Sequence, residues 1–462
     1  MSPELPAIHI FEPSHLGHRP FFLLWLLSDP PLTRRWVLHT TPAVIAHPIL
    51  APLLRSPPAN LALVRLCSPH QQLGNGSVIS LLVRQLTTAI TYHRSWRRYA
   101  RAGDSAFIPY YDDLSLALAV MPWLTQGMPL VTIGMRAQFH QRRQGIASAG
   151  HQRGHGLKEF LLRRLLKRRT ARCYLTNQLP LKHEVDAHWG RLAKKVRFYP
   201  DPAERPVAVG KQNARRCLGL PHDRRYVLCY GSLTLRKGVG NLLEALEAPD
   251  WPQEASAIFA GAYRDEVETL LSSPRAEALA ARGVLRCYRG LVDQERENLL
   301  FQASDAVWVV YDGHDFMSGC LVQAGMHQRP VIGCVTGLIA WYITTFSAGL
   351  LYDSRPQHRD ASLRHLASLL RDDDRLAAEG AALGHAFARH SREDFRMAVY
   401  AAILGMADPV VGKLPLAHRR PGGDLDEAQL PQLGSGTLGE AQLAVADGDG
   451  IGHVQPACSG SR

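Results

Sequence analysis

The segment 303–352 constrains the fold of this chain more than any other part of the sequence. A hydrophobic run at 306–311 leads into a loop with glycine, histidine and aspartate, and a helical pattern follows from Gly319. A second apolar run, Pro-Val-Ile-Gly at 330–333, predicts another buried strand. Open α/β sheets bind their ligands in loops outside the carboxyl ends of the strands. We therefore expect a ligand-facing loop between the first strand and the helix of this segment.

Strand and helix patterns also alternate in the rest of the chain, on both sides of a proline cluster at 199–206. Strands are predicted at 7–11, 35–39, 61–66, 106–108, 130–133, 226–231, 257–260 and 284–288. Helices are predicted at 21–27, 213–220, 241–248, 265–281, 294–302, 363–370 and 374–390. Such alternation favours parallel sheets covered by helices on both faces. The prediction is an α/β protein with two Rossmann-like domains facing each other across a crevice.

The length and the proline cluster suggest where the domains divide. At 462 residues the chain exceeds what one hydrophobic core usually supports. We predict an N-terminal domain at 1–203, a C-terminal domain at 204–390, and a closing helix at 391–406. Residues 407–462 are rich in Pro, Gly, Asp and Gln without periodicity, which predicts a disordered tail.

The segment 315–332 resembles the donor-sugar segment of retaining glycosyltransferases with the GT-B fold, the large group 1 or family 4-like class. Those proteins have an acidic residue, a Gly-rich turn, a glutamate, an alanine and then Pro-Val-Ile. The matching positions here are Asp315, the turn 316–320, Gln323, Ala324 and 330–332. Both usual glutamates are altered, to Asp315 and Gln323. The resemblance covers 213–406 well and the first 200 residues loosely, and it implies a donor site in the second domain and an acceptor site in the first.

A polar loop at 230–239 provides a second point of resemblance. A strand is predicted to end at Gly231 and a helix to open near Gly238, so backbone N–H groups and a positive helix end meet there. Relatives have Gly-Arg-Leu, three residues, then Lys-Gly; Lys237 matches the lysine, and Ser232 stands where the arginine would be. The resemblance implies that Lys237, helped by Arg236, stabilises a leaving diphosphate. The alternative is a turn with solvated basic residues.

The resemblance implies a set of donor-site residues. Lys237 and Asp315 are the predicted catalytic residues, with Asp315 orienting the sugar and Gln323 bonding the ribose through its amide. The predicted donor-binding residues are Gly231, Ser232, Arg236, Gly261, Met317, Ser318, Gly319 and Gln323. A tight turn would explain Gly261 equally well. Loop polarity and helix capping would explain the segment that begins at Asp315.

On the acceptor side we expect Gly17, His18 and Asp112, which lie at predicted strand ends of the first domain. Turn and capping chemistry is the alternative explanation. Many relatives carry a histidine after the strand that corresponds to 130–133. This chain has Gly134 there, so no catalytic histidine is transferred.

No metal or cofactor is predicted, because the nucleotide sugar is a substrate. His140, His151 and His155 lie in a Gly- and Arg-rich stretch without a carboxylate, which disfavours a metal site. The run 372–374 of three aspartates is better explained by helix capping. The eight cysteines form no CxxC pair, which argues against a disulfide framework and favours a reducing cytoplasm.

The net charge of +12 is concentrated, with 16 Lys/Arg against three acids in 131–198. The stretch 156–175 has an amphipathic helical pattern with basic residues around it. It predicts a surface helix on its own sheet, or a patch that holds anionic lipid through 156–172. Aromatic residues are too sparse there for a single-strand nucleic-acid binder.

The uncharged stretch 330–352 is long enough for a membrane span. Its proline and glycines instead favour a series of short strands and helices separated by turns.

Together these observations predict a hexosyltransferase-like enzyme, retaining and metal-independent. It would move a sugar from a nucleotide-sugar donor to a saccharide or lipid-linked acceptor, in polysaccharide or glycoconjugate biosynthesis. Its place would be the cytoplasm, with peripheral contact at the inner face of the cell membrane. The alternative, suggested by Ser232 and Gln323, is a catalytically inactive glycosyltransferase-like binding or scaffold protein. Nucleic acid is not an expected partner.

Overall fold

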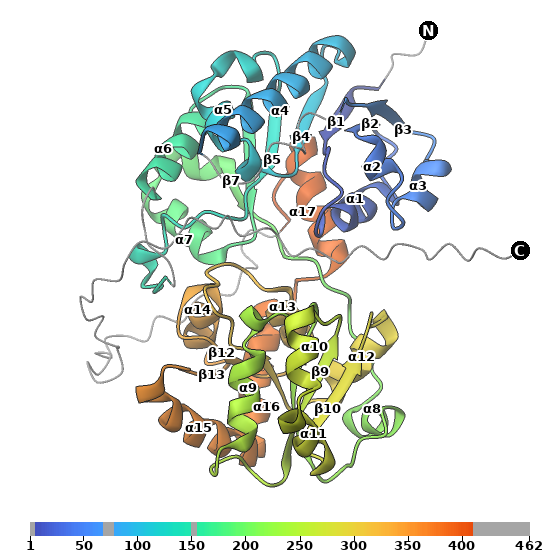
Figure 1. The fold of residues 1–462 in the computed structure, drawn as a ribbon. Helices are drawn as coiled ribbons and strands as arrows, with labels where there is room; N and C mark the ends of the chain where they lie inside the picture. Colours follow the sequence, from blue (N-terminus) through green and yellow to red (C-terminus); the bar gives the residue numbers. More distant parts are fainter. Residues whose placement is uncertain (1–4, 68–77, 149–154, 410–462) are drawn as a thin grey trace, which may run out of the picture.

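The computed structural model describes residues 5–67, 78–148 and 155–409, which form two Rossmann-like α/β domains, one above the other in Figure 1. The predicted tail lies outside these residues from position 410 onward. Each domain is built around a single parallel sheet with helices on both faces. The predicted fold class is therefore confirmed.

The first domain has a seven-stranded sheet in the order β3-β2-β1-β4-β5-β6-β7, with every neighbouring pair parallel. The strand order reverses between β1 and β4, and ligands of such sheets bind beyond the carboxyl ends at that point. The strands are β1 (Ala7–Phe11), β2 (Arg35–Thr40), β3 (Leu61–Arg65), β4 (Ser105–Ile108), β5 (Leu130–Ile133), β6 (Ala171–Thr176) and β7 (Val196–Phe198). The helices are α1 (Arg19–Leu27), α2 (Pro42–Ile45), α3 (Ala51–Arg55), α4 (Val78–Tyr99), α5 (Ser115–Val120), α6 (His155–Leu166) and α7 (Leu179–His188), with short 3₁₀ turns η1 (Tyr111–Asp113), η2 (Pro122–Thr125), η3 (Arg142–Gln144) and η4 (Gly190–Lys195).

The second domain has a six-stranded parallel sheet in the order β10-β9-β8-β11-β12-β13, so its order also reverses beside its first strand. The strands are β8 (Arg225–Tyr230), β9 (Ala255–Gly261), β10 (Leu285–Arg289), β11 (Ala306–Val309), β12 (Val331–Gly333) and β13 (Gly349–Leu351). The helices are α8 (Lys211–Cys217), α9 (Val239–Glu247), α10 (Asp265–Leu271), α11 (Pro274–Ala281), α12 (Gln294–Ala303), α13 (Gly319–Met326), α14 (Gly337–Phe346), α15 (Pro356–Arg371) and α16 (Asp373–Phe387), with the turn η5 (Leu235–Lys237).

Two predicted helices are wrong in extent. The helix predicted at 265–281 is divided into α10 and α11, because Pro274 has no N–H to continue a helix and Ser273 caps the second one by accepting from the amide of Ala276. The helical pattern at 156–175 ends at Leu166, and its last residues belong to β6, where alternate apolar residues fit a buried strand.

The uncharged stretch 330–352 contains β12, α14 and β13, all packed into the second domain. Its apolar residues are explained by burial on both faces of a parallel sheet. None of the helices in the described part of the chain combines the length and the hydrophobicity that crossing a bilayer requires.

The chain passes between the domains twice, and the two crossings are bonded to each other. The amide of Ala203 donates to the carbonyl of His390 at 2.8 Å, beside a bridge between Ala203 and Ser391. The last described helix, α17 (Arg392–Leu404), then lies on the first domain, where the hydroxyl of Tyr400 donates to the carbonyl of Leu26. One hydrophobic cluster joins buried residues of both domains and α17.

Candidate functional site

The loop after β8 folds Lys237 back over the end of its own strand. Its Nζ donates to the carbonyl of Tyr230 at 3.0 Å, and the thiol of Cys320 approaches the same carbonyl at 3.5 Å. Gly231 has φ of 109°, and a Cβ there would lie 2.6 Å from Lys237 Nζ. This backbone conformation favours glycine, and the missing Cβ leaves room for the ammonium at the carboxyl end of β8.

Gly238 allows this loop to pack against the neighbouring strand β11. It has φ of 68°, and a Cβ would come within 2.2 Å of the carbonyl of Val310. The indole of Trp308 donates to the carbonyl of Gly238 at 3.2 Å. Gly261, at the end of β9, has φ of 132° and would strike the carbonyl of Gly231 at 1.9 Å with any side chain. Close backbone packing thus accounts for Gly261 without a ligand.

Arg236 links the two motifs that the sequence singled out. Its Nη1 donates to Nδ1 of His314 at 3.1 Å, and the amide of Asp312 donates to the carbonyl of Arg236 at 2.8 Å. The guanidinium carbon of Arg236 and Nζ of Lys237 lie 5.8 Å and 5.6 Å from the ring centre of Tyr311. Two cations therefore share one aromatic ring at the carboxyl ends of β8 and β11. Sequence reasoning assigned no role to Tyr311, the last residue of the apolar run 306–311, or to His314 in the loop that follows it.

The start of α13 lies beside Lys237. Ser318 caps the helix by accepting from the amide of Leu321, and its hydroxyl lies 3.4 Å from that of Tyr311. The first helical residue, Gly319, has open space at its Cβ position. Because Cys320 and Lys237 both reach the carbonyl of Tyr230, the positive end of α13 and the ammonium are neighbours. Such a pair suits an anion.

The remaining donor-side predictions fall around the same place. Ser232 is half-buried directly after Gly231, and the carbonyl of Met317 lies 3.2 Å from Nε2 of His314. Within the described residues, the side-chain oxygen of Gln323 is buried without a hydrogen-bond partner. Buried amide oxygens are rarely left unpaired, so this oxygen retains the capacity to accept a hydrogen bond.

Asp315 is buried, with 5% of its surface exposed, and is held by the first domain. Its Oδ2 accepts from Ser148 Oγ at 2.5 Å and from Gln138 Nε2 at 3.3 Å. Its carbonyl accepts from Gln141 Nε2 at 3.1 Å. The residue predicted to face the sugar is therefore bonded, in this conformation, to the loop that follows β5.

The acceptor-side residues lie at the carboxyl edge of the first sheet. Gly17 has φ of 63° just before α1, and His18 stands at the helix start with its ring 5.8 Å from that of Tyr110. Asp112 accepts from the amides of Met135 at 2.8 Å and Arg136 at 3.3 Å, while burial raises its pKa.

Glu12 and Arg19, which sequence reasoning missed, form an ionic cluster on this edge. Arg19 binds Glu12 at 3.2 Å and also Asp113, and lies 4.0 Å from the ring centre of Tyr110. Burial raises the pKa of Glu12, which directly follows β1. The sequence signal that could have found this cluster is the run of polar residues after the buried strand β1.

The space beside Gly134, after β5, is filled by Tyr174. A Cβ on Gly134 would lie 1.9 Å from the hydroxyl of Tyr174, a residue of the neighbouring strand β6. A histidine at this position would require Tyr174 to move, and Tyr174 is buried in the core of the first domain.

Metal-site predictions can be compared with the described residues only. His140 is buried, His151 lies outside the described residues, and His155 is the first residue of α6. Among the described residues, no group of three or more His, Cys, Asp or Glu is placed to hold a metal ion.

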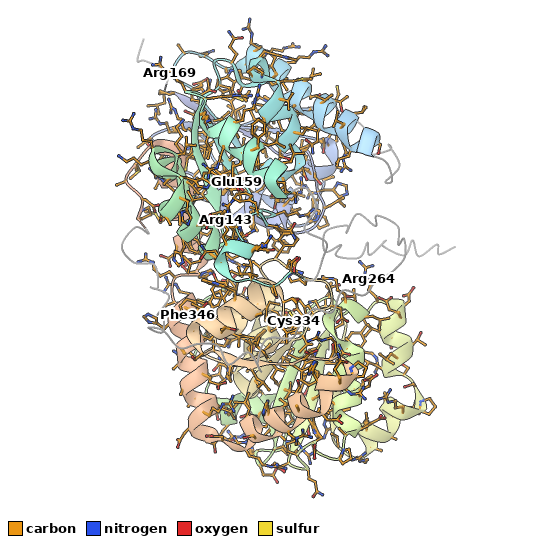
Figure 2. The ribbon with its side chains drawn as sticks, turned by 90° about the vertical axis from the view of Figure 1, so that its left-hand side faces the viewer. Arg143, Glu159, Arg169, Arg264, Cys334 and Phe346 are labelled. Atoms are coloured by element: carbon orange, nitrogen blue, oxygen red, sulfur yellow. The ribbon has the colours of Figure 1, made fainter. Side chains whose placement is uncertain are left out.

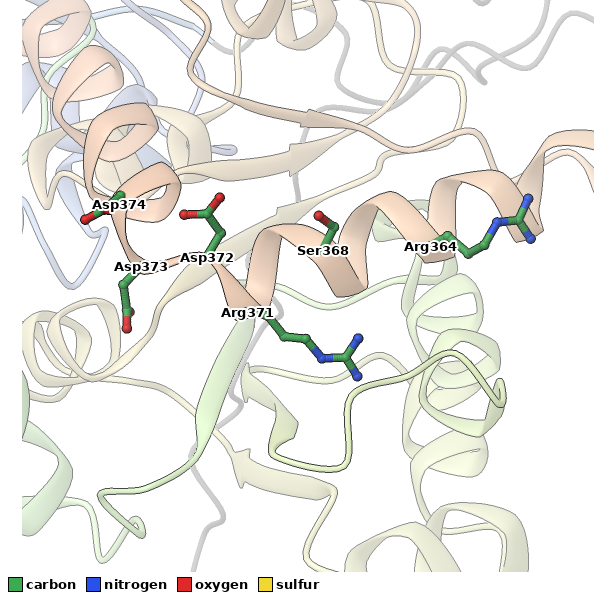
Figure 3. A pocket seen from close by; sticks show the side chains of 6 residues that line it. All are labelled: Arg364, Ser368, Arg371, Asp372, Asp373 and Asp374. Carbon is green, nitrogen blue, oxygen red and sulfur yellow. The ribbon is translucent and has the colours of Figure 1, made fainter.

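The aspartate run 372–374 caps a helix, as predicted. Asp372 accepts from the amide of Arg375 at the start of α16, and Asp373 pairs with Arg225 at 2.7 Å. These aspartates line a surface hollow of about 660 Å³ with Arg364, Ser368 and Arg371 (Figure 3). Arg225 begins β8, so the hollow lies at the opposite end of the strand from Lys237.

Comparison with solved structures identifies the architecture. The chain is similar to the Candida albicans trehalose-6-phosphate phosphatase N-terminal domain (TM-score 0.58, 11% identity, 87% of this chain and 97% of that one). It is similar to Anabaena HepE in complex with UDP (0.57, 13%, 87% and 100%). It is also similar to sucrose-phosphate synthase from Thermosynechococcus elongatus (0.53, 14%, 87% and 97%). Neither a family model nor a curated protein sequence matches the chain.

These comparisons define the fold class. The structural neighbours include GT-B glycosyltransferases, and this chain has the GT-B fold over both domains. HepE has been solved with UDP and with UDP-glucose. At 11–14% identity the likeness defines the fold alone.

Proposed function

We propose that the protein is a glycosyltransferase that takes a sugar from a nucleotide-sugar donor. The observation that carries this proposal is the meeting of Lys237 with the start of α13 at the carboxyl ends of β8 and β11. In this reaction the sugar–phosphate bond breaks and negative charge develops on the diphosphate. A fixed ammonium beside a helix N-terminus stabilises that charge.

Each donor group has a counterpart in the site. Lys237 faces the diphosphate, assisted by Arg236 and by the N–H groups of Ser318 and Gly319. The unpaired oxygen of Gln323 accepts from a ribose hydroxyl. The fold supports this assignment, because structural neighbours with the same architecture have been solved with UDP and UDP-glucose. Retention of configuration and metal independence are part of the proposal.

The acceptor is proposed to bind at the edge of the first sheet that carries Gly17, His18 and Asp112. We propose a saccharide or lipid-linked saccharide as acceptor, in polysaccharide or glycoconjugate biosynthesis. The cluster of Glu12, Arg19 and Asp113 offers charged hydrogen-bonding groups on this edge.

Peripheral attachment to an anionic membrane is part of the same proposal. The adjoining helices α4, α5 and α6 expose large apolar side chains, and α4 contains no acidic residue. The exposed apolar residues on these helices and η2 include Leu81, Leu82, Val83, Val120, Trp123, Leu157 and Phe160. Lys167 and Arg169 are exposed nearby, and Figure 2 shows Arg169 on the part of the first domain away from the second. Apolar side chains bordered by cations suit a lipid surface at the cytoplasmic side.

A second candidate is a glycosyltransferase-like binding protein without turnover. Ser232 in place of an arginine and Gln323 in place of a glutamate favour it. Titration of the purified protein with UDP, GDP and ADP, followed by transfer assays with the matching nucleotide sugars, distinguishes the enzyme from the binding protein. Binding with transfer supports the enzyme, binding without transfer or donor hydrolysis supports the binding protein, and no binding contradicts both.

A further inference from the structure

We propose that Asp315 is a positioning residue. The loop 134–148 of the first domain binds it, and this contact fixes the turn of the second domain that leads to α13. This inference rests on the proposed function only for its consequence in catalysis. It assigns the carboxylate a different task from direct contact with the sugar.

The loop is fixed to the first domain at several points. The amide of Met135 donates to Asp112, and Gln144 donates to Glu184 at 3.0 Å. Arg143 binds Glu184 at 2.7 Å and Glu159 at 2.9 Å. Glu184 is fully buried in α7, so the loop is attached to the core of its own domain. In Figure 2, Arg143 and Glu159 lie on the first domain, and Cys334 lies across the boundary in the second.

The far side of the loop contacts Asp315 and the start of α14 in the second domain. Ser148 and Gln138 donate to Oδ2 of Asp315, and Gln141 donates to its carbonyl. The carbonyl of Ala147 accepts from the amide of Gly337 at 2.7 Å. Four hydrogen bonds thus join the loop to Asp315 and to the first residue of α14.

Asp315 and Gly337 are themselves interlocked. Gly337 has φ of 72°, and a Cβ there would lie 2.7 Å from the Cα of Asp315. The amide of Leu338 donates to the carbonyl of Asp315 at 3.3 Å. A shift of Asp315 therefore moves the amide that bonds Ala147, and it also moves the turn leading to Ser318 and α13.

The geometry explains how domain arrangement and donor site are coupled. With the loop in contact, the Asp315 carboxylate is buried and fixes the turn that presents the N–H groups of α13 beside Lys237. When the loop leaves, the carboxylate is exposed to water and the turn loses three bonds. Closure of the domains thus completes the anion-facing site, and opening dismantles it.

The amide of Gly337 is the direct probe, because it donates across the boundary. Hydrogen exchange of the full chain without nucleotide is measured on the peptide containing Gly337, in Ser148→Ala, Asp315→Asn and the native protein. Loss of about one hydrogen bond to a charged group predicts exchange faster by roughly ten-fold or more. Asp312 is an exposed carboxylate in the segment between β11 and α13 that also contains Asp315. Asp312→Asn is the matched control and should leave the exchange of Gly337 unchanged. Amides of β9 serve as the fold control.

Non-additivity gives the second readout. If Ser148 and Asp315 act on each other, the double variant should exchange no faster than Asp315→Asn alone. Unchanged exchange at Gly337 in both single variants, or fully additive effects, would overturn the proposal. The outcome is independent of donor chemistry, since UDP binding to Lys237→Ala tests the donor site separately.

Discussion

Lys237 donates from Nζ to the carbonyl of Tyr230, the last residue of β8, so the ammonium is held over the strand it follows. This bond fixes the cation before any ligand arrives. A preorganised charge of this kind stabilises a transition state without reorganisation at the moment of reaction.

Lys237→Ala should therefore abolish transfer while the fold stays intact. Losing one such group typically costs about 3–4 kcal/mol of barrier, on the order of 100- to 1,000-fold in rate. Arg236→Ala is the matched comparison, since it should cost nearly as much if Arg236 takes the place of the missing arginine at Ser232. Steady-state rates with a nucleotide sugar, alongside circular dichroism, measure both. Full turnover in Lys237→Ala would contradict the phosphate assignment.

Asp201→Asn should stabilise the protein at neutral pH. Burial raises the pKa of Asp201 from 3.8 to about 6, although Asn177 donates to its Oδ2 at 3.2 Å. The folded state thus binds the proton more tightly than the unfolded state, so this carboxyl costs stability above pH 6 and the cost fades as pH falls toward 3.8. The gain in melting temperature should be larger at pH 8 than at pH 5. The exposed Asp250→Asn is the control, and an equal gain at both pH values would contradict the argument.

Gly134→Ala should destabilise the first domain, because its Cβ would overlap the hydroxyl of Tyr174. Overpacking of this kind costs about 1–3 kcal/mol. Gly240→Ala, within α9 and with open space around the added Cβ, should be neutral or gain up to about 1 kcal/mol. Urea unfolding of the two variants compares them, and equal stability would show that Tyr174 moves freely.

Asp305→Ala should cost about 3–5 kcal/mol, since it leaves a buried cation unpaired. Asp305 accepts from Arg215 at 2.7 Å and from the amide of Tyr226 at 2.7 Å, and both side chains of the ion pair are buried. Asp373→Ala removes an exposed partner of Arg225 and should change stability by less than about 1 kcal/mol. Chemical denaturation distinguishes these values, and similar effects for the two variants would refute the difference in burial as the cause.

Vesicle binding should depend on Lys167 and Arg169 rather than on every cation of the stretch 156–172. Arg164 and Arg168 donate to the carbonyl of Ala119 at the end of α5, so they are engaged within the domain. Neutralising Lys167 and Arg169 should weaken flotation with anionic vesicles by about 1 kcal/mol per residue, with strong salt dependence. Arg168→Gln should instead lower the melting temperature. Flotation that is the same in all variants would discard the lipid-facing surface.

The local parts of the site were predictable from the sequence, and the long-range contacts were not. The loop that holds Gly231, Lys237 and Gly238 could be predicted, because these residues lie within eight positions and their arrangement depends on local backbone conformation. Ser148 and Asp315 are separated by 167 positions, and nothing in either segment indicates the other. The pattern at 171–175 is compatible with a helix as well as a strand, because a short apolar run fits both periods. The pairing of β6 with β5 and β7 shows that it is a strand.

The double crossing at Ala203 and His390 means that neither domain is one continuous piece of chain. A fragment that stops before α17 lacks the helix whose Phe395 and Tyr400 complete the core of the first domain, and a fragment that starts after β7 carries that helix without its partner. The two halves therefore cannot be separated by a single cut or exchanged by a single recombination event. Because Ala203 and His390 bond the two crossings to each other, any relative movement of the two domains pivots at this pair.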